Sequence, residues 1–112
     1  MIQLELRIVS DPNGVERMSQ ALYSLMPPVQ LDRGCEGSRL YADPGESNSF
    51  FYVEEWATQE DLQREMRSER FRRLLSVMES SPVPPRLEFR FVARTRGLDY
   101  VAEVLPVEAE PE

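Results

Sequence analysis

The chain contains no histidine and no lysine, so all 13 of its basic residues are arginine. Histidine is the commonest general base and zinc ligand, and lysine supplies the amine of a Schiff base, so sites built on these groups are excluded. Haem held by histidine is excluded for the same reason. The single cysteine, Cys35, can form neither an internal disulfide nor a thiolate cluster. With no imidazole to activate its thiol, we interpret it as a small, half-buried residue rather than a nucleophile.

Other absences narrow the range of partners. The 5 glycines form no phosphate-binding motif. No apolar run approaches the roughly 20 residues of a transmembrane helix, and charges interrupt residues 1–7 where a signal peptide would be apolar. The net charge of −7 works against binding a phosphate backbone, which depends on Lys and Arg. We therefore expect a cytoplasmic protein with no nucleic-acid or membrane partner.

The residues that are present indicate a globular chain. Hydrophobic residues make up 41% and charged residues 29% of the 112 positions, which is a globular composition. This length suits one domain with one core. We predict a single domain over residues 1–105, followed by an acidic, disordered tail over residues 106–112.

Hydrophobic periodicity predicts four strands and two helices. The predicted strands span residues 2–9, 35–42, 49–56 and 87–92. The first helix follows the cap and first-turn proline at residues 11–12 and ends at Pro27-Pro28. The second begins at Thr58 with a capping box, and Ser68 predicts a break or a shift of register within it. Residues 98–105 suit either a short strand or a docking arm.

This order of elements, β-α-β-β-α-β, describes a ferredoxin-like α+β unit, in which both helices cover one face of a four-stranded antiparallel sheet. The residues predicted to lie beneath the helices are Ile2, Leu4, Leu6, Ile8, Phe51, Val53, Leu87, Phe89 and Phe91. Those predicted for the opposite face are Gln3, Glu5, Arg7, Arg39, Tyr41, Tyr52, Glu54, Trp56, Glu88 and Arg90. Exposed aromatic surfaces of this kind mark partner or ligand sites.

The second helix carries many charges of both signs. Its basic residues are Arg64, Arg67, Arg70, Arg72 and Arg73, and its acidic residues are Glu60, Asp61, Glu65 and Glu69. Opposite charges three or four positions apart are neighbours on a helix surface. We therefore predict a solvated, salt-bridged face.

Three segments together resemble the antibiotic biosynthesis monooxygenase family of the dimeric α+β barrel superfamily: Phe51–Trp56, Thr58–Leu62 and Ser68–Leu74. The resemblance covers roughly residues 1–94. It implies a ferredoxin-like unit whose sheet packs against that of a second copy in a homodimer. The superfamily also includes chlorite dismutases, haem-degrading proteins, muconolactone isomerases and stress proteins, so the resemblance favours a fold more strongly than an activity.

The chain departs from that family pattern at two places. Many members carry a histidine in the helix after the tryptophan, where this chain has residues 64–67 without one, so haem degradation is not implied. Some cofactor-free oxygenases of the family place an asparagine four residues before the tryptophan, where this chain has Tyr52. Only the tryptophan carries over, as Trp56.

The first functional hypothesis is a monooxygenase that acts on a quinol or polycyclic phenol without a metal, flavin or other cofactor. The candidate catalytic residues are Tyr52, Glu54, Trp56 and Arg90, and the candidate substrate-binding residues are Arg39, Tyr41 and Glu88. The aromatic rings would sandwich the substrate and an arginine would stabilise its phenolate. Glu54 would accept the phenol proton if burial raises its pKa.

Alternatives from other classes stay open. The chain also suits a dimeric binding or accessory protein for a small ligand without turnover, or an interaction module that recruits a partner through residues 98–105. Trp56 can also be interpreted as a dimer-interface anchor, and Glu54 as one half of a cross-strand ion pair with Arg39 or Arg90. In each case we predict a homodimer that buries the aromatic face in a hydrophobic interface larger than the roughly 1,200 to 2,000 Å² of a standard contact.

Overall fold

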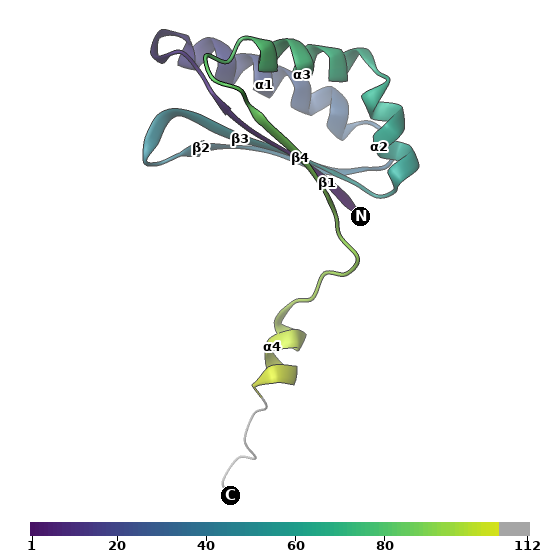
Figure 1. Cartoon of the computed structure of the whole chain (residues 1–112). Coiled ribbons are helices and arrows are strands. Elements are labelled where there is room, and N and C mark those ends of the chain that lie inside the picture. The colour runs from purple at the N-terminus through teal and green to yellow at the C-terminus, as the bar shows by residue number, and fades with distance from the viewer. Residues whose placement is uncertain (106–112) are drawn as a thin grey trace, which may run out of the picture.

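The structure, a computed structural model, describes residues 1–105, and the predicted tail over 106–112 lies outside the described residues. The strands are β1 (Ile2–Val9), β2 (Cys35–Asp43), β3 (Glu46–Trp56) and β4 (Arg86–Phe91). The helices are η1 (Pro12–Gly14), α1 (Val15–Gln30), α2 (Gln59–Met66), α3 (Glu69–Glu79) and α4 (Leu98–Val104). Figure 1 shows this course of the chain.

The four strands form one antiparallel sheet in the order β2-β3-β1-β4. Helices α1, α2 and α3 lie on one face of this sheet and leave the other face open (Figure 1). This is the predicted ferredoxin-like α+β fold, and the prediction is confirmed. Within residues 1–105, no helix is long and apolar enough to cross a membrane.

The core lies between the sheet and the three helices. It consists of alternate residues of the central strand β1 and of one side of each helix, because a strand turns every second residue to the same face. Its fully buried aliphatic members include Leu4, Leu6, Leu22 and Leu74. Burial of this apolar surface is the main favourable term in the stability of the domain.

The helix boundaries test the predicted caps. Thr58 Oγ1 accepts a hydrogen bond from the Asp61 amide at 3.1 Å, and Ser68 Oγ accepts one from the Phe71 amide at 3.3 Å. The predicted start at Thr58 and the break at Ser68 are therefore confirmed. Asp11, by contrast, makes no side-chain cap, because η1 comes between it and α1.

The end predicted for α1 at Pro27-Pro28 is wrong, because the helix continues through both prolines to Gln30. A proline removes one backbone hydrogen bond from a helix. Here the loss falls in the last turn, where Val29 is buried in the core and the Leu31 amide donates to the Val29 carbonyl. Packing and this closing bond offset the missing amides.

The two faces of β3 are the opposite of those predicted. In the ladder with β1, Trp56 lies across from Ile2, Glu54 from Leu4 and Tyr52 from Leu6. Residues directly opposite each other share a face, so the three β3 side chains lie beneath the helices. Phe51 and Val53 point to the open face instead. The predicted faces of β1 and β4 are correct.

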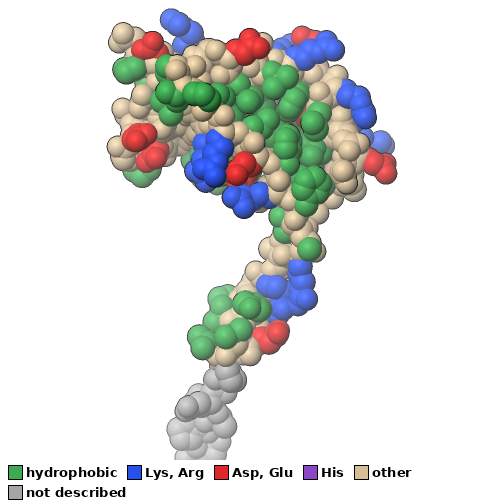
Figure 2. Space-filling model, viewed as in Figure 1, with side chains coloured by type: hydrophobic (Ala, Val, Ile, Leu, Met, Phe, Trp, Pro, Cys, Tyr) green, Lys and Arg blue, Asp and Glu red, His purple; other side chains and the backbone are tan. Residues whose placement is uncertain are grey.

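Residues 98–104 form helix α4, so the strand considered for this segment is wrong, and its role as a docking arm stays a prediction. Figure 1 shows α4 standing away from the sheet and the other helices. Arg96 forms ion pairs with Asp99 at 2.8 Å and Glu103 at 2.6 Å, which satisfies the polar side of the arm. Its apolar side chains face solvent, with Leu98 85% exposed (Figure 2).

Candidate functional site

A cluster of three polar side chains lies inside the core at the end of β3. Tyr52 Oη donates a hydrogen bond to Glu54 Oε2 at 2.6 Å, and Trp56 Nε1 donates one to Glu54 Oε1 at 3.0 Å. The Tyr52 and Trp56 side chains are fully buried, and Glu54 is 3% exposed. We call these three residues the Glu54 cluster.

The local sequence explains how such a cluster is buried. Residues 52, 54 and 56 follow each other on one face of the strand, because side chains alternate with period two. The central carboxylate has a hydrogen-bond donor on each side, so the polar atoms of all three residues satisfy one another. A buried polar group is costly only when it lacks a partner.

Burial sets the proton affinities of this site. Loss of hydration raises the pKa of Glu54 above its ordinary value of 4.5, although the bonds from Tyr52 and Trp56 lower it in part. Burial also raises the pKa of the Tyr52 hydroxyl, and the neighbouring Glu54 raises it further. A carboxyl group whose pKa moves toward neutrality is suited to accept and return a proton near neutral pH.

Neighbouring residues on β2 complete this part of the core. Ser38 lies directly across from Glu54, is 6% exposed, and its Oγ has no hydrogen-bond partner among residues 1–105. Cys35 lies across from Trp56, and its thiol donates to the Gly37 carbonyl at 3.5 Å. Burial raises the pKa of that thiol, which fits the interpretation of Cys35 as an unreactive residue.

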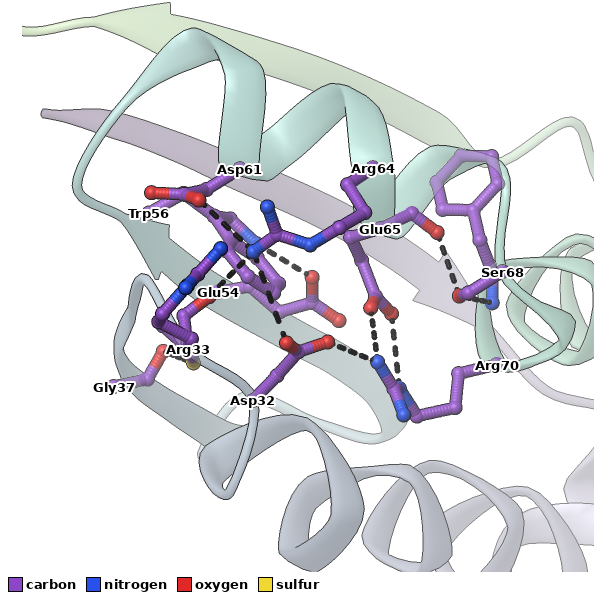
Figure 3. A network of polar contacts seen from close by, with 12 residues as sticks. Asp32, Arg33, Gly37, Glu54, Trp56, Asp61, Arg64, Glu65, Ser68 and Arg70 are labelled. Atoms are coloured by element: carbon purple, nitrogen blue, oxygen red, sulfur yellow. Dashed lines mark hydrogen bonds and ion pairs between the residues drawn. The ribbon is translucent and has the colours of Figure 1, made fainter.

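A buried ion pair lies beside the Glu54 cluster, as Figure 3 shows. Glu65 on α2 is 2% exposed, and its two carboxylate oxygens accept from Arg70 at 2.7 and 3.4 Å. Arg70 also pairs with Asp32 in the loop between α1 and β2. We call Asp32, Glu65 and Arg70 the arginine clamp, because Arg70 joins this loop to α2.

A second set of contacts holds α2 to the same loop. Arg64 pairs with Asp61 at 2.9 Å and donates to the Arg33 carbonyl at 2.7 Å (Figure 3). Gly34 has a positive φ of 90°, which favours glycine, and a β-carbon there would overlap Asp61. The α2 helix therefore lies tightly against the loop, over the Glu54 cluster.

These contacts modify the prediction of a solvated, charged helix face. Arg64 with Asp61 and Arg72 with Glu69 form the expected surface pairs. Glu65 is the exception, since it lies in the interior. Sequence reasoning missed it, as it missed Asp32 and Ser38. The available signal was the Leu62–Glu65 spacing of three, which places that carboxylate on the same side of the helix as a core leucine.

An apolar groove runs between α2 and β4, on the same side of the sheet as the Glu54 cluster. Its volume is about 200 Å³, and it is lined by Gln59, Leu62, Gln63, Met66, Phe89 and Phe91. The groove belongs to a larger apolar surface on this side of the molecule (Figure 2). Across the sheet, Leu4 on β1 lies between Glu54 on β3 and Phe89 on β4. The groove therefore begins one strand away from the Glu54 cluster.

The remaining predicted site residues lie on the opposite, open face. Arg39 pairs with Glu55 at 3.1 Å, and Arg90 pairs with Glu5 at 2.7 Å and lies 3.9 Å from Glu88. Neither arginine pairs with Glu54, so the ion pair considered for that residue is wrong.

Tyr41, the last of these residues, stacks on Phe51 on the open face. The candidate residues are therefore divided between the two faces, with Tyr52, Glu54 and Trp56 on one and Arg39, Tyr41, Glu88 and Arg90 on the other. A single ligand cannot contact both groups through an intact sheet.

Among residues 1–105, no group of three or more Cys, Asp or Glu side chains is placed to hold a metal ion. The Glu54 carboxylate is instead occupied by two neutral donors, and the Glu65 carboxylate by a guanidinium. What the arrangement offers is therefore proton transfer and hydrogen bonding within an aromatic core.

The sequence profile of the family described as antibiotic biosynthesis monooxygenase matches residues 1–76, which is more than half of the chain. The chain belongs to this family. The match includes β1, α1, β2, β3, α2 and most of α3, and with them the Glu54 cluster and the arginine clamp. No curated protein matches the chain in sequence.

Solved structures of distant relatives share the fold. A putative antibiotic biosynthesis monooxygenase from Deinococcus radiodurans superposes with a TM-score of 0.79 at 9% identity, covering 87% of this chain and 97% of the relative. One from Nitrosomonas europaea gives 0.74 at 9% identity, with coverages of 84% and 100%. A Pseudomonas aeruginosa protein gives 0.71 at 22% identity, with coverages of 83% and 94%.

Membership of the antibiotic biosynthesis monooxygenase family makes Trp56 the residue of most interest. It is the one position that carries over from the family pattern, and it lies in the interior rather than on the exposed face. Tyr52, where some members have asparagine, donates to the same carboxylate as Trp56. The three residues predicted to share one face of the strand therefore do share it, but that face lies in the core and not on the exposed side of the sheet.

Proposed function

We propose that this chain is a monooxygenase that oxidises a quinol or polycyclic phenol with O₂ and without a metal or organic cofactor. Family membership supports the reaction class. The observation that carries the proposal is the buried Glu54 carboxylate, whose pKa is raised by burial and which lies between Tyr52 and Trp56. It is the best-placed proton acceptor in the described part of the chain.

The reaction balances with O₂ as the only oxidant. A ring C–H of the phenol becomes a carbonyl, one oxygen atom enters that position, and the other leaves as water. The substrate supplies all the electrons that reduce O₂, because a phenolate is electron-rich enough to transfer one electron directly. The protein then contributes desolvation, orientation and a group that accepts the phenol proton.

Each residue of the Glu54 cluster has a role in this proposal. Glu54 accepts the phenol proton. Tyr52 and Trp56 hold its two oxygens and present aromatic surface to the substrate ring. The unpartnered Ser38 hydroxyl, directly across from Glu54, hydrogen-bonds the substrate oxygen, which would satisfy a buried atom that otherwise has no partner.

Access to this site requires movement of α2. The Glu54 cluster is closed to solvent, and the adjoining groove of about 200 Å³ is smaller than the roughly 300 to 1,000 Å³ of ordinary ligand pockets. We propose that the substrate enters through this groove when the arginine clamp opens. Arg70 then also supplies positive charge near the phenolate.

We further propose a cytoplasmic homodimer in which the open sheet faces lie against each other. The interface predicted from the sequence was hydrophobic because it contained Tyr52 and Trp56, but both are in the core of one chain. The open face instead consists mainly of ion pairs around Val53 and Phe51. We therefore expect a more polar contact, detected as a dimer by sedimentation at micromolar concentration.

The alternative is a dimeric binding or accessory protein without turnover. The closed state of the Glu54 cluster and the lack of histidine favour it. The two functions differ in oxygen consumption. With a binding protein, a ligand would quench Trp56 fluorescence saturably, but no O₂ would be consumed. Recruitment of a partner through the exposed α4 arm is compatible with either function.

The test is oxygen uptake with a panel of quinols and polycyclic phenols, run under air and under nitrogen, with identification of the product. We expect aerobic formation of the quinone by protein purified without a cofactor. Glu54→Gln should lower kcat by roughly 100-fold or more, the usual contribution of a general base.

Glu55→Gln is the matched control, because the neighbouring carboxylate lies on the open face. Equal rates in Glu54→Gln and the unaltered chain would contradict the role of Glu54. Activity that depends on a tightly held flavin, haem or metal would contradict the cofactor-free reaction.

A further inference from the structure

Helix α4 exposes one apolar side to solvent. We call residues 98–105, which contain this helix, the arm. Residues three, four or seven positions apart lie on the same side of a helix, and on the arm this side consists of Leu98, Val101, Val104 and Leu105. Each of these side chains is at least 49% exposed. Asp99 and Glu103 lie on another side, where both pair with Arg96.

A helix of this length needs a surface to pack against. The arm contains only seven helical residues, and isolated helices shorter than roughly 12 to 15 residues are marginal in water. Most of the stability of helices in proteins comes from packing of their apolar side. The exposed side of the arm therefore points to a contact with an apolar partner surface.

The groove between α2 and β4 has the matching chemistry. Its lining contains aromatic and aliphatic side chains and two glutamines but no charged residue. Two of its members face solvent, since Met66 is 39% and Phe91 is 63% exposed. The apolar side of the arm also lacks charge, so contact between the two surfaces removes apolar area from water without burying an ion.

The arm lies on the wrong side of the sheet to cover the groove of its own chain. The Val92 amide donates to the Met1 carbonyl at 2.8 Å, so the chain stays attached to β1 until it has passed Phe91. Residues 93–97 then continue away from the sheet, and α4 lies opposite to α1, α2 and α3 (Figure 1). This is the side on which we place the second copy. To reach its own groove, the chain would have to reverse direction directly after Val92.

The segment between β4 and the arm is long enough to reach the second copy. Residues 92–97 can span up to about 20 Å when extended. Stacked sheets lie only about 10 Å apart, so this segment can pass the edge of a second sheet and reach its helix side. The groove is accessible from that direction, because β4 is an edge strand of the sheet.

We propose that the arm of each copy packs into the α2–β4 groove of the other copy. The exchange is reciprocal, as in any contact with two-fold symmetry, so both arms and both grooves are covered. This inference rests on the homodimer proposed above. Each copy then supplies the outer wall of the groove through which we propose that substrate approaches the other copy's Glu54 cluster, and that site is incomplete in a single chain.

The test links arm and groove chemically in full-length chains. Cys35→Ser removes the only thiol, and Val101→Cys or Gln63→Cys then introduces one thiol on the arm or in the groove. The two single-thiol chains are co-expressed, treated with a short bis-maleimide and analysed by mass spectrometry. We expect a peptide of the arm joined to a peptide of the groove. Because each chain has one thiol, such a product can form only between two copies.

Gln20→Cys is the matched control for the groove variant, since it places a thiol at an exposed position on α1, also on the helix side. It should give no product with the arm. A sedimenting dimer without the arm–groove product, or equal linkage to the control, would overturn the proposal. Linkage found only within one chain that carries both thiols would overturn it as well, because the arm would then fold back on its own groove.

The dimer dissociation constant gives a second measurement. Val101→Asp places a charge on the apolar side of the arm, and it should raise this constant about tenfold or more. Thr95→Asp adds the same charge to the exposed segment before the arm and should leave the constant unchanged. Equal effects of both variants would contradict the exchange. Neither measurement uses O₂ uptake, so an inactive chain that forms the product would contradict only the oxygenase reaction, and a monomer would contradict the dimer and the exchange together.

Discussion

Glu54 and Glu55 are the same residue type at adjacent positions of one strand, yet their environments differ completely. Glu54 lies beneath the helices, where burial raises its pKa. Glu55 lies on the open face, where hydrogen bonds from Gln3 and Arg39 lower its pKa. The pleat of β3 therefore gives two adjacent carboxylates pKa shifts of opposite direction.

The same contrast extends to the arginines of each side. On the helix side, Arg70 binds the buried Glu65 in the arginine clamp. On the open side, Arg39 binds Glu55 with half of its own side chain in water. Mutation of one partner of a buried charge pair changes the free energy of unfolding far more than mutation of one partner of a hydrated pair. The two faces should respond differently to equivalent substitutions.

The largest difference should follow from removing these arginines. Arg70→Met leaves Glu65 buried without a cation, so the free energy of unfolding should fall by roughly 3 to 5 kcal/mol. Arg39→Met should change it by about 0 to 1 kcal/mol, as for other hydrated pairs. Urea unfolding of the two variants measures both values.

A double variant sharpens this comparison. Arg70→Met combined with Glu65→Leu removes both charges, and it should recover most of the lost stability, because an apolar pair fills the same buried space. If the single variant Arg70→Met unfolds at the same urea concentration as the unaltered chain, the buried pair is not a clamp. The movement proposed for α2 would then need another explanation.

An intermediate difference should follow from removing tyrosine hydroxyls. Tyr52→Phe deletes the donor to Glu54 Oε2, and the stability should fall by about 1 to 3 kcal/mol, since a buried oxygen loses its partner. Tyr41→Phe, on the exposed stack with Phe51, should change stability by less than about 0.5 kcal/mol. Thermal unfolding followed by circular dichroism distinguishes the two. Similar losses in both variants would contradict the importance of the Glu54 cluster.

Much of the fold was predictable from sequence. Residues 2–9 and 87–92 have apolar side chains at every second position. Only one face of β1 and of β4 can therefore be packed against the core. The caps at Thr58 and Ser68 have local chemical signatures, and both were found where predicted. These features depend on near neighbours in the chain, which a single sequence displays.

The faces of β3 were not predictable by the same reasoning. Four consecutive residues, 50–53, are aromatic or β-branched, so the odd-numbered and the even-numbered positions both offer apolar side chains for the core. A shift of one residue exchanges the two faces of the strand. The prediction put Glu54 on the open face together with Tyr52 and Trp56. Hydrogen bonds from Tyr52 and Trp56 compensate the buried Glu54 carboxylate for its lost hydration. The sequence alone does not show that these three side chains contact one another. Within the arginine clamp, the contact between Asp32 and Arg70 joins residues 38 positions apart along the chain and has no local signature.

The smallest difference between the two faces should appear in how stability depends on pH. Glu54 and Glu55 should change the free energy of unfolding in opposite directions as pH rises. The folded state binds a proton at Glu54 more tightly than the unfolded state does. As pH rises above the ordinary value of 4.5, Glu54 therefore lowers the free energy of unfolding. The Glu54→Gln variant should accordingly gain stability relative to the unaltered chain as pH rises from about 4.5 toward neutrality.

Glu55 should behave in the opposite way. Its folded pKa lies below 4.5, so it contributes stability that is present above pH 4.5 and is lost as pH falls through the folded pKa. Because the pair with Arg39 is hydrated, the contribution should be only about 0.2 to 1 kcal/mol. Glu55→Gln should therefore be slightly less stable than the unaltered chain at pH 7, and this difference should shrink as pH falls below 4.5. Urea unfolding of both variants from pH 3 to 8 measures the two curves, and slopes of the same sign would show that the carboxylates share one environment.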